Sequence, residues 1–309
     1  MNTMADPMKH SKTNSPISGR IVKGIGGFYT VKTEDGQTVT AKPIGIFRHQ
    51  HLTPTVGDFV EAVKEDEQDQ YYAMSAIKPR KNLFVRPPVA NVDTAIVTFA
   101  LRAPKPNLLL IDKMLVACEV RGVAPVLCFT KADLAKPRDF DVIEIYRKTP
   151  YPIVVSAGDA PEKIQETAEK LKAFIGSGTA FFSGPSGVGK STLTNALCGR
   201  DIMDTGHLSK KLKRGKHTTR HVELLTLPDG GYLFDTPGFS SLRLDDGIDE
   251  AMLREAFAEF PRGACKFADC RHVKEPGCAV REGVEAGRIA PSRYENYLAL
   301  MDQLASRKL

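Results

Sequence analysis

The 309-residue chain is predicted to form three consecutive domains: a small β-barrel, an α/β domain and a helical module. Short strand patterns separated by turn residues fill residues 16–80, as in small barrels. Strand patterns then alternate with helix patterns over residues 81–243, which predicts a mostly parallel sheet with helices on both faces. Helix patterns and a group of cysteines follow in residues 244–309. Residues 1–15 are polar and aperiodic, so we expect a disordered tail there.

The composition is that of a globular protein with one distinctly basic stretch. Hydrophobic residues make up 42% of the chain and charged residues 26%, which allows a sizeable core. The net charge of +6 is compatible with a polyanionic partner. Many of the basic residues lie close together: Lys210, Lys211, Lys213, Arg214, Lys216 and Arg220. No apolar run has membrane-spanning length and no signal-peptide pattern is present, so we expect a cytoplasmic protein with no membrane partner.

Residues 16–80 have the pattern of a five-stranded barrel. The candidate strands are Gly19–Lys23, Phe28–Thr33, Thr38–Lys42, Asp58–Lys64 and Tyr71–Ile77. The E-D-G-Q sequence at 34–37 indicates a hairpin between the second strand and the third. Five short strands in so few residues favour the OB-fold, a barrel that often binds oligonucleotides. We therefore interpret residues 16–80 as an OB-like RNA-binding domain, with an all-β spacer domain as the alternative.

Residues 81–243 have the alternation typical of an α/β domain. The candidate strands are Ala95–Leu101, Ala124–Phe129, Ile153–Val155, Thr179–Phe182, Val222–Leu227 and Tyr232–Phe234. Helix patterns separate most of them, and the first of these can begin at Asn107, which suits an N-cap. Cys118, Cys128 and Cys198 lie in apolar patterns within these elements, and we expect them to be core residues.

The sequence G-P-S-G-V-G-K-S at 184–191 is a phosphate-binding loop between a strand pattern and a helix pattern. Its glycines let backbone N–H groups converge on phosphate oxygens, and the helix N-terminus adds partial positive charge. Lys190 can reach the β- and γ-phosphates, which gives it a catalytic role, and Ser191 can ligate Mg²⁺. The expected nucleotide contacts are the loop and the residue after it: Gly184, Pro185, Ser186, Gly187, Val188, Gly189, Lys190, Ser191 and Thr192.

Two further segments suit the magnesium side of this site. The D-T-P-G sequence at 235–238 ends a strand pattern, so Asp235 can face Mg²⁺ and the Gly238 N–H can meet the γ-phosphate. Thr218 and Thr219 lie between this segment and the phosphate loop, where a switch threonine would close over the ion. We take Thr219 as the ligand, with Thr218 as the alternative. The predicted magnesium ligands are therefore Ser191, Thr219 and Asp235.

Two loops earlier in the chain suit recognition of guanine. Residues 130–133 read T-K-A-D, similar to the N-K-x-D loop that reads this base. A carboxylate at Asp133 can accept from the ring N–H and the exocyclic amine of guanine, whereas adenine offers the opposite pattern. Lys131 would pack along the base, and Thr130 replaces the usual Asn with one fewer anchoring group. Ser156 and Ala157 match the short S-A loop whose backbone touches the base.

These five elements are those of a GTPase, but their order along the chain is unusual. The base-reading loops come first, followed by the phosphate loop, the switch threonine and the D-T-P-G segment. A circular permutation explains this order, because joining the ordinary termini and opening the chain elsewhere leaves the sheet intact. We therefore predict a circularly permuted GTPase domain in residues 81–243.

The carboxy-terminal cysteines have the spacing of a metal site. Cys265, Cys270, His272 and Cys278 supply three thiolates and one imidazole, which complete a tetrahedral shell for Zn²⁺. Gly263 and the glycine before the last cysteine supply turns. No open coordination position is left, so we expect one structural zinc ion rather than a catalytic one, in a helical domain over residues 244–309.

Together these motifs resemble the ribosome small-subunit-dependent GTPases of the RsgA type, over residues 16–309. The resemblance implies a GTP hydrolase that binds the small ribosomal subunit and its rRNA late in maturation, with hydrolysis stimulated by the subunit. It also places a histidine before the switch threonines, and the G-K-H-T-T sequence at 215–219 matches. An apolar residue, Phe239, follows the D-T-P-G segment and cannot orient water. We therefore expect His217 to help position the attacking water, with a plain RNA contact as the alternative.

Two other functions stay open on the sequence alone. One is a permuted GTPase that acts on large-subunit assembly, because the core motifs would be the same. The other is an RNA-binding assembly factor that uses GTP mainly as a sensor, although Lys190, Ser191 and Asp235 argue against an inactive site. We expect a monomer that binds GTP and GDP.

Overall fold

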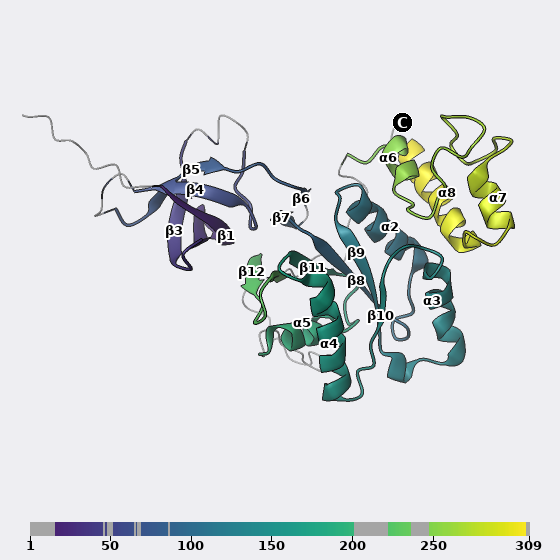
Figure 1. The fold of residues 1–309 in the computed structure, drawn as a ribbon, viewed down its shortest axis with the longest axis horizontal. Helices are drawn as coiled ribbons and strands as arrows, with labels where there is room; N and C mark the ends of the chain where they lie inside the picture. Colours follow the sequence, from purple (N-terminus) through teal and green to yellow (C-terminus); the bar gives the residue numbers. More distant parts are fainter. Residues whose placement is uncertain are drawn as a thin grey trace, which may run out of the picture. The chain divides into compact units, whose positions relative to one another are not determined.

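The computed structural model describes residues 16–306, apart from 46, 48–51, 65, 67, 68, 86, 201–221 and 236–246. The chain divides into two compact units, which meet along the sequence at Arg80 and Lys81 (Figure 1). In the described part, no helix is both long and apolar enough to cross a membrane.

The first unit is a closed five-stranded barrel, as predicted. Its strands are β1 (Ile17–Ile25), β2 (Phe28–Thr33), β3 (Thr38–Pro43), β4 (Phe59–Val63) and β5 (Tyr72–Ile77). The strand order is β1-β2-β3-β5-β4, and β1 also pairs with β4, which closes the barrel. Ile21, Val31, Val60 and Met74 are fully buried inside it. At Gly19 a Cβ would lie 2.6 Å from the carbonyl oxygen of the neighbouring strand, so the close pairing of β1 and β2 requires glycine there.

The second unit contains a six-stranded sheet of order β10-β9-β8-β11-β13-β12, parallel except for β12. Its strands are β8 (Thr94–Ala100), β9 (Ala124–Thr130), β10 (Ile153–Val155), β11 (Thr179–Ser183), β12 (Glu223–Thr226) and β13 (Tyr232–Asp235). All seven residues of β8 and all five of β11 are buried. Strands buried on both faces have continuous apolar sequences, which is why these two could be predicted.

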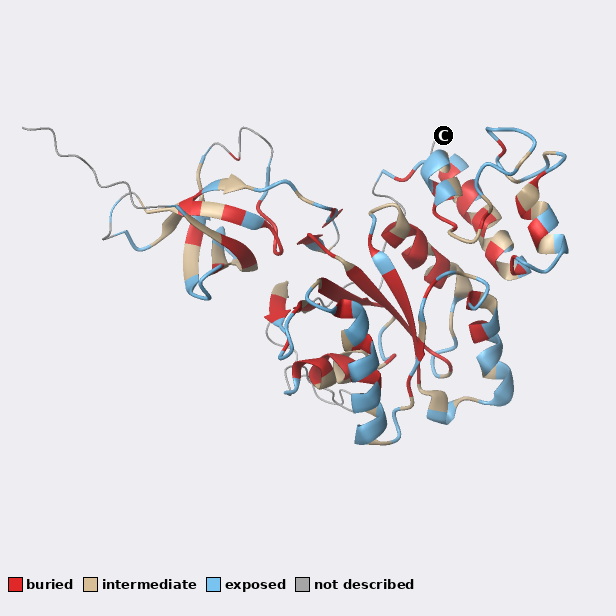
Figure 2. Cartoon of the chain, viewed as in Figure 1, coloured by how far each residue is buried: buried red, intermediate tan, exposed pale blue. Residues whose placement is uncertain are grey.

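Helices cover both faces of this sheet (Figure 1). They are α2 (Leu108–Glu119), α3 (Asp141–Tyr146), α4 (Pro161–Ile175) and α5 (Lys190–Cys198). Leu171 of α4 and Leu197 of α5 join Ile96 and Val126 of the sheet in one apolar cluster. Figure 2 shows the central strands buried along their length, whereas the outer sides of α3 and α4 are exposed. The Asn107 side chain caps α2 by accepting from the Leu110 N–H, as its position predicts.

Two elements differ from the sequence expectation. A short hairpin, β6 (Leu83–Val85) with β7 (Pro88–Ala90), follows the predicted linker, where no strands were expected. The spacing of Met252, Leu253, Ala256, Phe257 and Phe260 predicts one apolar helix face. This prediction is wrong, because α6 (Glu250–Glu255) ends before Phe257 and Met252 is 44% exposed. Phe257 and Phe260 are nevertheless buried, and they pack from the chain that follows the helix.

The last part of the second unit packs its helices α6, α7 (Ala279–Glu285) and α8 (Pro291–Ala305) around an apolar cluster of its own. Val116 of α2 belongs to the same cluster, so these helices pack against helix α2 of the α/β part. Tyr297, Met301 and Leu304 of α8 are buried, as their helical spacing in the sequence predicts for a packing face.

A buried ionic network joins α8 to the α/β part. Arg293 of α8 is 1% exposed and donates to the Asp112 carboxylate of α2 at 2.6 Å. It also donates to both carboxylate oxygens of Glu259, at 2.6 and 2.9 Å. Tyr146 and Asn296 donate to Asp112 as well, each at 2.7 Å. Every charge in this network therefore has a partner, as buried charges require.

Candidate functional site

Three of the described loops meet at the carboxyl edge of the six-stranded sheet. Parallel strands end at the same edge, so the segments after β9, β10 and β11 are brought together, and Asp235 ends β13 at this edge too. The strand order reverses between β8 and β11: the chain proceeds outward to β9 and β10 on one side, and from β11 to β13 on the other. Ligands of open α/β sheets bind at such a switch point.

The phosphate loop lies at this point, between β11 and α5. Gly184, Gly187 and Gly189 have φ angles of 137°, 76° and 97°, a region that favours glycine. A Cβ on Gly184 would lie 1.9 Å from the Thr98 carbonyl oxygen of β8, so no other residue fits there. No side chain caps the N-terminus of α5, which leaves its backbone N–H groups directed at the loop.

Lys190 lies across this loop. Its Nζ donates to the carbonyl oxygens of Gly184 and Pro185, at 2.7 and 2.6 Å. Burial lowers the pKa of the Lys190 ammonium, because the charged form is partly removed from water. Phosphate oxygens entering the loop would offer this cation a stronger partner than neutral carbonyls do.

Asp235, the last residue of β13, is the acidic group of this edge. Its Oδ1 atom is buried and has no hydrogen-bond partner in the described part of the chain. Burial and then the charge of Glu223, its neighbour across the strand pair, raise the pKa of Asp235. A buried, unpartnered carboxylate oxygen near a phosphate loop suits a hard cation, so Asp235 and the Ser191 hydroxyl could hold Mg²⁺.

The predicted base-reading loops also meet here. Thr130 donates from Oγ1 to the Val188 carbonyl oxygen of the phosphate loop at 2.6 Å, which ties the two loops together. Asp133 accepts from the Gly158 N–H at 2.7 Å, and Ala132 donates to the Ser156 carbonyl at 3.1 Å. The segments after β9 and β10 therefore form one surface, from which the exposed Asp133 carboxylate projects.

Two details of this surface were not expected from the sequence. Lys131 has a φ of 56° and donates to the Ala103 carbonyl oxygen at 2.6 Å, so the loop after β8 supports it. No motif marks Ala103. The Ser156 hydroxyl is buried and accepts from the Thr167 hydroxyl of α4 at 3.0 Å, so this serine anchors its loop through its side chain. Ala157 and the Gly158 backbone remain beside Asp133.

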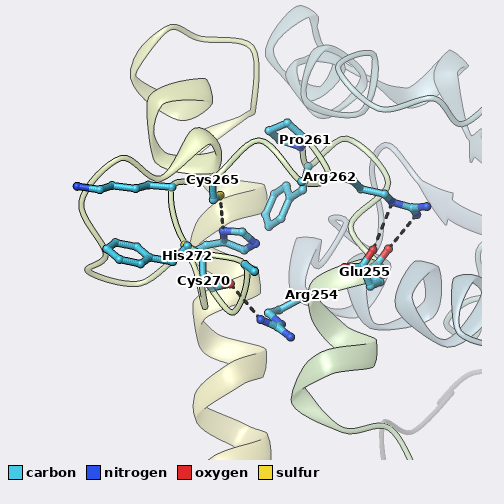
Figure 3. A pocket seen from close by; sticks show the side chains of 12 residues that line it. Arg254, Glu255, Pro261, Arg262, Cys265, Cys270 and His272 are labelled. Carbon is cyan, nitrogen blue, oxygen red and sulfur yellow. Dashed lines mark hydrogen bonds and ion pairs between the residues drawn. The ribbon is translucent and has the colours of Figure 1, made fainter.

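The four predicted metal ligands form a compact cluster, and Figure 3 shows three of them, Cys265, Cys270 and His272. The ligand atoms of Cys265, Cys270, His272 and Cys278 all lie within 4.8 Å of one another. His272 Nδ1 is 3.5 Å from the Cys265 sulfur and 3.4 Å from the Cys278 sulfur. Burial raises the pKa of the Cys270 thiol to about 12, so a thiolate there needs a cation beside it. Three sulfurs and one imidazole nitrogen at these separations could hold a tetrahedral zinc ion.

Backbone contacts hold the loops around this cluster. Tyr294 and Tyr297 of α8 donate to the carbonyl oxygens of His272 and Arg271, each at 2.7 Å. Glu275 accepts from the backbone N–H groups of three nearby residues, which together hold its pKa at about 2. His272 itself has a φ of 60°. The ligand loop is therefore oriented by hydrogen bonds rather than by regular secondary structure.

Several predicted site residues lie outside the described residues. They are His217, Thr218, Thr219, Gly238 and the basic stretch from Lys210 to Arg220. The expected tail at 1–15 also lies outside them.

Comparison with known proteins identifies the family. The family model described as RsgA GTPase matches residues 77–245, and the model of the RsgA N-terminal domain matches residues 18–71. The chain belongs to the RsgA GTPase family. It is therefore a GTP hydrolase, and hydrolysis of GTP implies Mg²⁺ in the site described above.

Relatives of known name cover nearly the whole chain. A "small ribosomal subunit biogenesis GTPase RsgA" of Caldanaerobacter subterraneus is 44% identical over 94% of this chain and 97% of its own. The corresponding protein of Alkaliphilus metalliredigens is 40% identical over 94% and 98%. The crystal structure of YjeQ from Thermotoga maritima has a TM-score of 0.78 at 35% identity, covering 94% of this chain and 99% of that one.

The permuted order of motifs is confirmed. YloQ, whose crystal structure is described as a circularly permuted GTPase, has a TM-score of 0.76 at 31% identity and covers 98% of this chain and 99% of its own. The strand order found here agrees. β11, which leads into the phosphate loop, lies between β8 and β13 in the sheet, but it comes after β9 and β10, which lead into the base-reading loops, along the chain.

Proposed function

We propose that this GTPase binds the small ribosomal subunit and assists its late maturation, with GTP hydrolysis stimulated by the subunit. The observation that carries the proposal is the full-length match to proteins named for small-subunit biogenesis. The barrel unit, which precedes the core in the sequence, and the Cys/His module, which follows it, are suited to contacts with rRNA. The protein acts as a cytoplasmic monomer in this proposal.

The direct test is GTP turnover by the full chain with purified ribosomal subunits. We expect small subunits to raise turnover by at least about tenfold and large subunits to leave it unchanged. Stimulation by large subunits alone would support action on large-subunit assembly instead. Subunit binding that depends on GTP, without any stimulated hydrolysis, would support a sensor.

The proposed contacts with GTP follow from the edge of the sheet. Asp133 reads guanine, the phosphate loop with Lys190 holds the phosphates, and Ser191 and Asp235 hold Mg²⁺. Ala157 and Thr192 complete the contacts on the base side and the phosphate side. Zn²⁺ occupies the Cys/His cluster as a structural ion.

An Asp133→Asn variant tests the base assignment. An amide presents a donor where the carboxylate presents only acceptors, so it fits xanthine, which has a carbonyl in place of the exocyclic amine. We expect GTP affinity to fall by about 100-fold and affinity for xanthosine triphosphate to rise, since a bidentate pair contributes about 1–3 kcal/mol of discrimination. Unchanged preference for GTP would contradict the assignment.

His217 is proposed to position the attacking water. We expect His217→Ala to lower subunit-stimulated turnover by about 100-fold while GTP affinity stays within about twofold. His207→Ala, just before the basic stretch, serves as the matched control and should keep most of its turnover. Equal losses in the two variants would favour a general RNA contact for both histidines.

A further inference from the structure

Thr130 occupies the position at which base-reading loops of this type usually have asparagine. Its side chain lies at the end of β9 and is 5% exposed. Its Oγ1 atom is 2.6 Å from the Val188 carbonyl oxygen of the phosphate loop and 3.4 Å from the Phe99 carbonyl oxygen of β8. Two carbonyl oxygens therefore enclose the hydroxyl group, and its one proton is donated to the nearer of them, that of Val188.

The exchange of asparagine for threonine removes a hydrogen-bond donor from the base site. An asparagine amide has two N–H groups, so it can donate to the phosphate loop and to a base at the same time. The Thr130 hydroxyl cannot do both. If its proton turned to a base, the Val188 carbonyl would lose this donor and the hydroxyl oxygen would face two carbonyl oxygens. Thr130 therefore connects the two loops and has no donor left for the nucleotide.

Guanine needs both acceptors and donors from the protein. Its ring N–H and exocyclic amine are donors, which suit the Asp133 carboxylate, whereas its O6 and N7 atoms are acceptors. The loop after β10 offers one free donor for them, because the Ala157 N–H has no partner in the described part of the chain. The N–H groups on either side of it are taken. Ser156 donates to the Phe129 carbonyl oxygen at 2.8 Å, and Gly158 donates to Asp133 at 2.7 Å.

The order of these protein groups matches the order of atoms around the base. From the exocyclic amine, the edge of guanine runs through the ring N–H and O6 to N7, and then toward the ribose. Ala157 lies next to the contact between Gly158 and Asp133, so its N–H suits O6. Thr130 lies against the phosphate loop, which is the ribose and phosphate side of the site. N7 therefore falls to Thr130, which has no proton to donate to it.

We propose that Thr130 makes this site indifferent to N7 of guanine. Asp133 binds the ring N–H and the exocyclic amine, the Ala157 N–H binds O6, and Thr130 holds the base-reading loop against the phosphate loop. The site accordingly accepts guanine nucleotides in which N7 is replaced. This inference rests on the proposed contacts with GTP, because it specifies one edge of the base that they bind.

The test compares GTP with 7-deaza-GTP, in which a C–H group replaces N7. Competition against a fluorescent GDP on the full chain measures both affinities independently of turnover. We expect the two affinities to agree within about twofold, because no hydrogen bond is lost. A 7-deaza-GTP affinity at least about fivefold below that of GTP would overturn the proposal, since one lost hydrogen bond costs about that much.

Thr130→Asn should create the missing contact. Its amide can donate to Val188 and to N7 together, so this variant should bind GTP about fivefold more tightly than 7-deaza-GTP. Thr130→Ser keeps the hydroxyl and is the matched control, with the two affinities again within about twofold. Equal binding of the two nucleotides by the Thr130→Asn protein would show that position 130 does not face N7, and the proposal would fail.

Thr130→Val separates the connection between the loops from recognition of the base. This variant loses the hydroxyl and keeps its shape, so its affinities for GTP and 7-deaza-GTP should fall by the same factor. A fall for GTP alone would show that the hydroxyl does bind N7, which overturns the proposal.

Inosine triphosphate tests the contacts on which this inference rests. It lacks the exocyclic amine, so the unmodified chain should bind it at least about tenfold more weakly than GTP. Equal binding of inosine triphosphate and GTP would contradict the assignment of Asp133 in the proposed function. A preference for GTP over 7-deaza-GTP would contradict the role of Thr130 alone.

Discussion

The phosphate loop and the Cys/His cluster are built in opposite ways. The phosphate loop takes its shape from backbone: it lies between a buried strand and a helix, and a single Cβ at Gly184 would collide with β8. The cluster takes its shape from side chains, because its ligands lie in a segment between α6 and α7 that contains no helix or strand. Strand and helix backbone fix the first site, whereas side-chain hydrogen bonds orient the loops of the second, and a bound metal would link its four ligands.

This difference teaches where each site is vulnerable. Loss of nucleotide leaves the α/β sheet intact, but loss of the proposed zinc removes the one partner that the three cysteines and the histidine share. The Arg293 network joins the two regions, since it connects α8 to α2 through buried charges. The predictions below follow from this contrast, from the largest expected effect to the smallest.

Removal of one metal ligand should have the largest effect. Cys278→Ser should reduce bound zinc from about one ion per chain to none and lower the midpoint of thermal unfolding by about 10 °C. Acidification should release the metal from the unmodified protein too, because the thiolates protonate. Cys198→Ser, outside the cluster, is the control and should retain the ion. A Cys278→Ser protein that keeps stoichiometric zinc would refute the ligand set.

The second largest effect is expected from breaking the Arg293 network, which joins the two regions. Arg293→Ala leaves Asp112 and Glu259 buried without their cation, so we expect a loss of about 3–5 kcal/mol in urea unfolding. Arg271→Ala removes a pair with Glu250 whose arginine side chain is 52% exposed, and it should cost less than about 1 kcal/mol. Similar costs for the two variants would show that burial of the network does not matter.

The phosphate loop should be sensitive to one added methyl group. Gly184→Ala places Cβ against a backbone carbonyl that has no room to move, so we expect about 3 kcal/mol of destabilisation and loss of GTP binding. Gly187→Ala has a φ of 76° but open space around it, and should cost about 1 kcal/mol. Tight GTP binding by the Gly184→Ala protein would contradict the geometry.

Separation of the base-reading loop from the phosphate loop should have a smaller effect. Thr130→Val removes the hydroxyl that donates to Val188 and leaves a buried carbonyl without that donor. We expect GTP affinity to fall about fivefold, as measured by titration. Thr94→Val is the control. Thr94 lies at the start of β8, away from the phosphate loop, and its hydroxyl makes a long bond of 3.3 Å to the Phe174 carbonyl oxygen of α4.

The smallest effect concerns Asp235 in the absence of nucleotide. Its pKa is raised on folding, so the ionised carboxylate opposes folding at neutral pH, and this penalty fades as the pH falls through the raised value. Asp235→Asn should therefore stabilise the nucleotide-free protein at pH 7, by less than about 1 kcal/mol, with the difference shrinking as the pH falls through the raised pKa. With Mg²⁺ and GTP the order should reverse. A variant that is less stable than the parent at pH 7 without ligand would contradict this account.

The sequence allowed correct prediction of those features that depend only on residue type and on neighbouring residues. The cap at Asn107, the strand Ile153–Val155 and the four cysteine and histidine ligands follow from residue type and spacing, and the structure places them accordingly. The hairpin of β6 and β7 gave no signal, since its strands have three residues each and β7 begins with proline.

Long-range contacts could not be read from the sequence. The Thr130 bond to the phosphate loop spans 58 positions, and the pair of Asp112 and Arg293 spans 181. Within its helix, each of these charges looks like an ordinary surface residue. Only the packing of α8 on α2 shows that they neutralise each other.

The permuted order also decides when the sheet can be completed during synthesis. β8, β9 and β10 are made first and can pair with one another. One edge of β8, a strand whose residues are all buried in the finished protein, then has no partner strand. The edge stays open until β11 emerges, and β13 must follow before β11 is paired on both sides. A nascent chain of this protein therefore exposes an unpaired apolar strand edge from the synthesis of β8 until that of β11, and the chain is prone to aggregate during that interval.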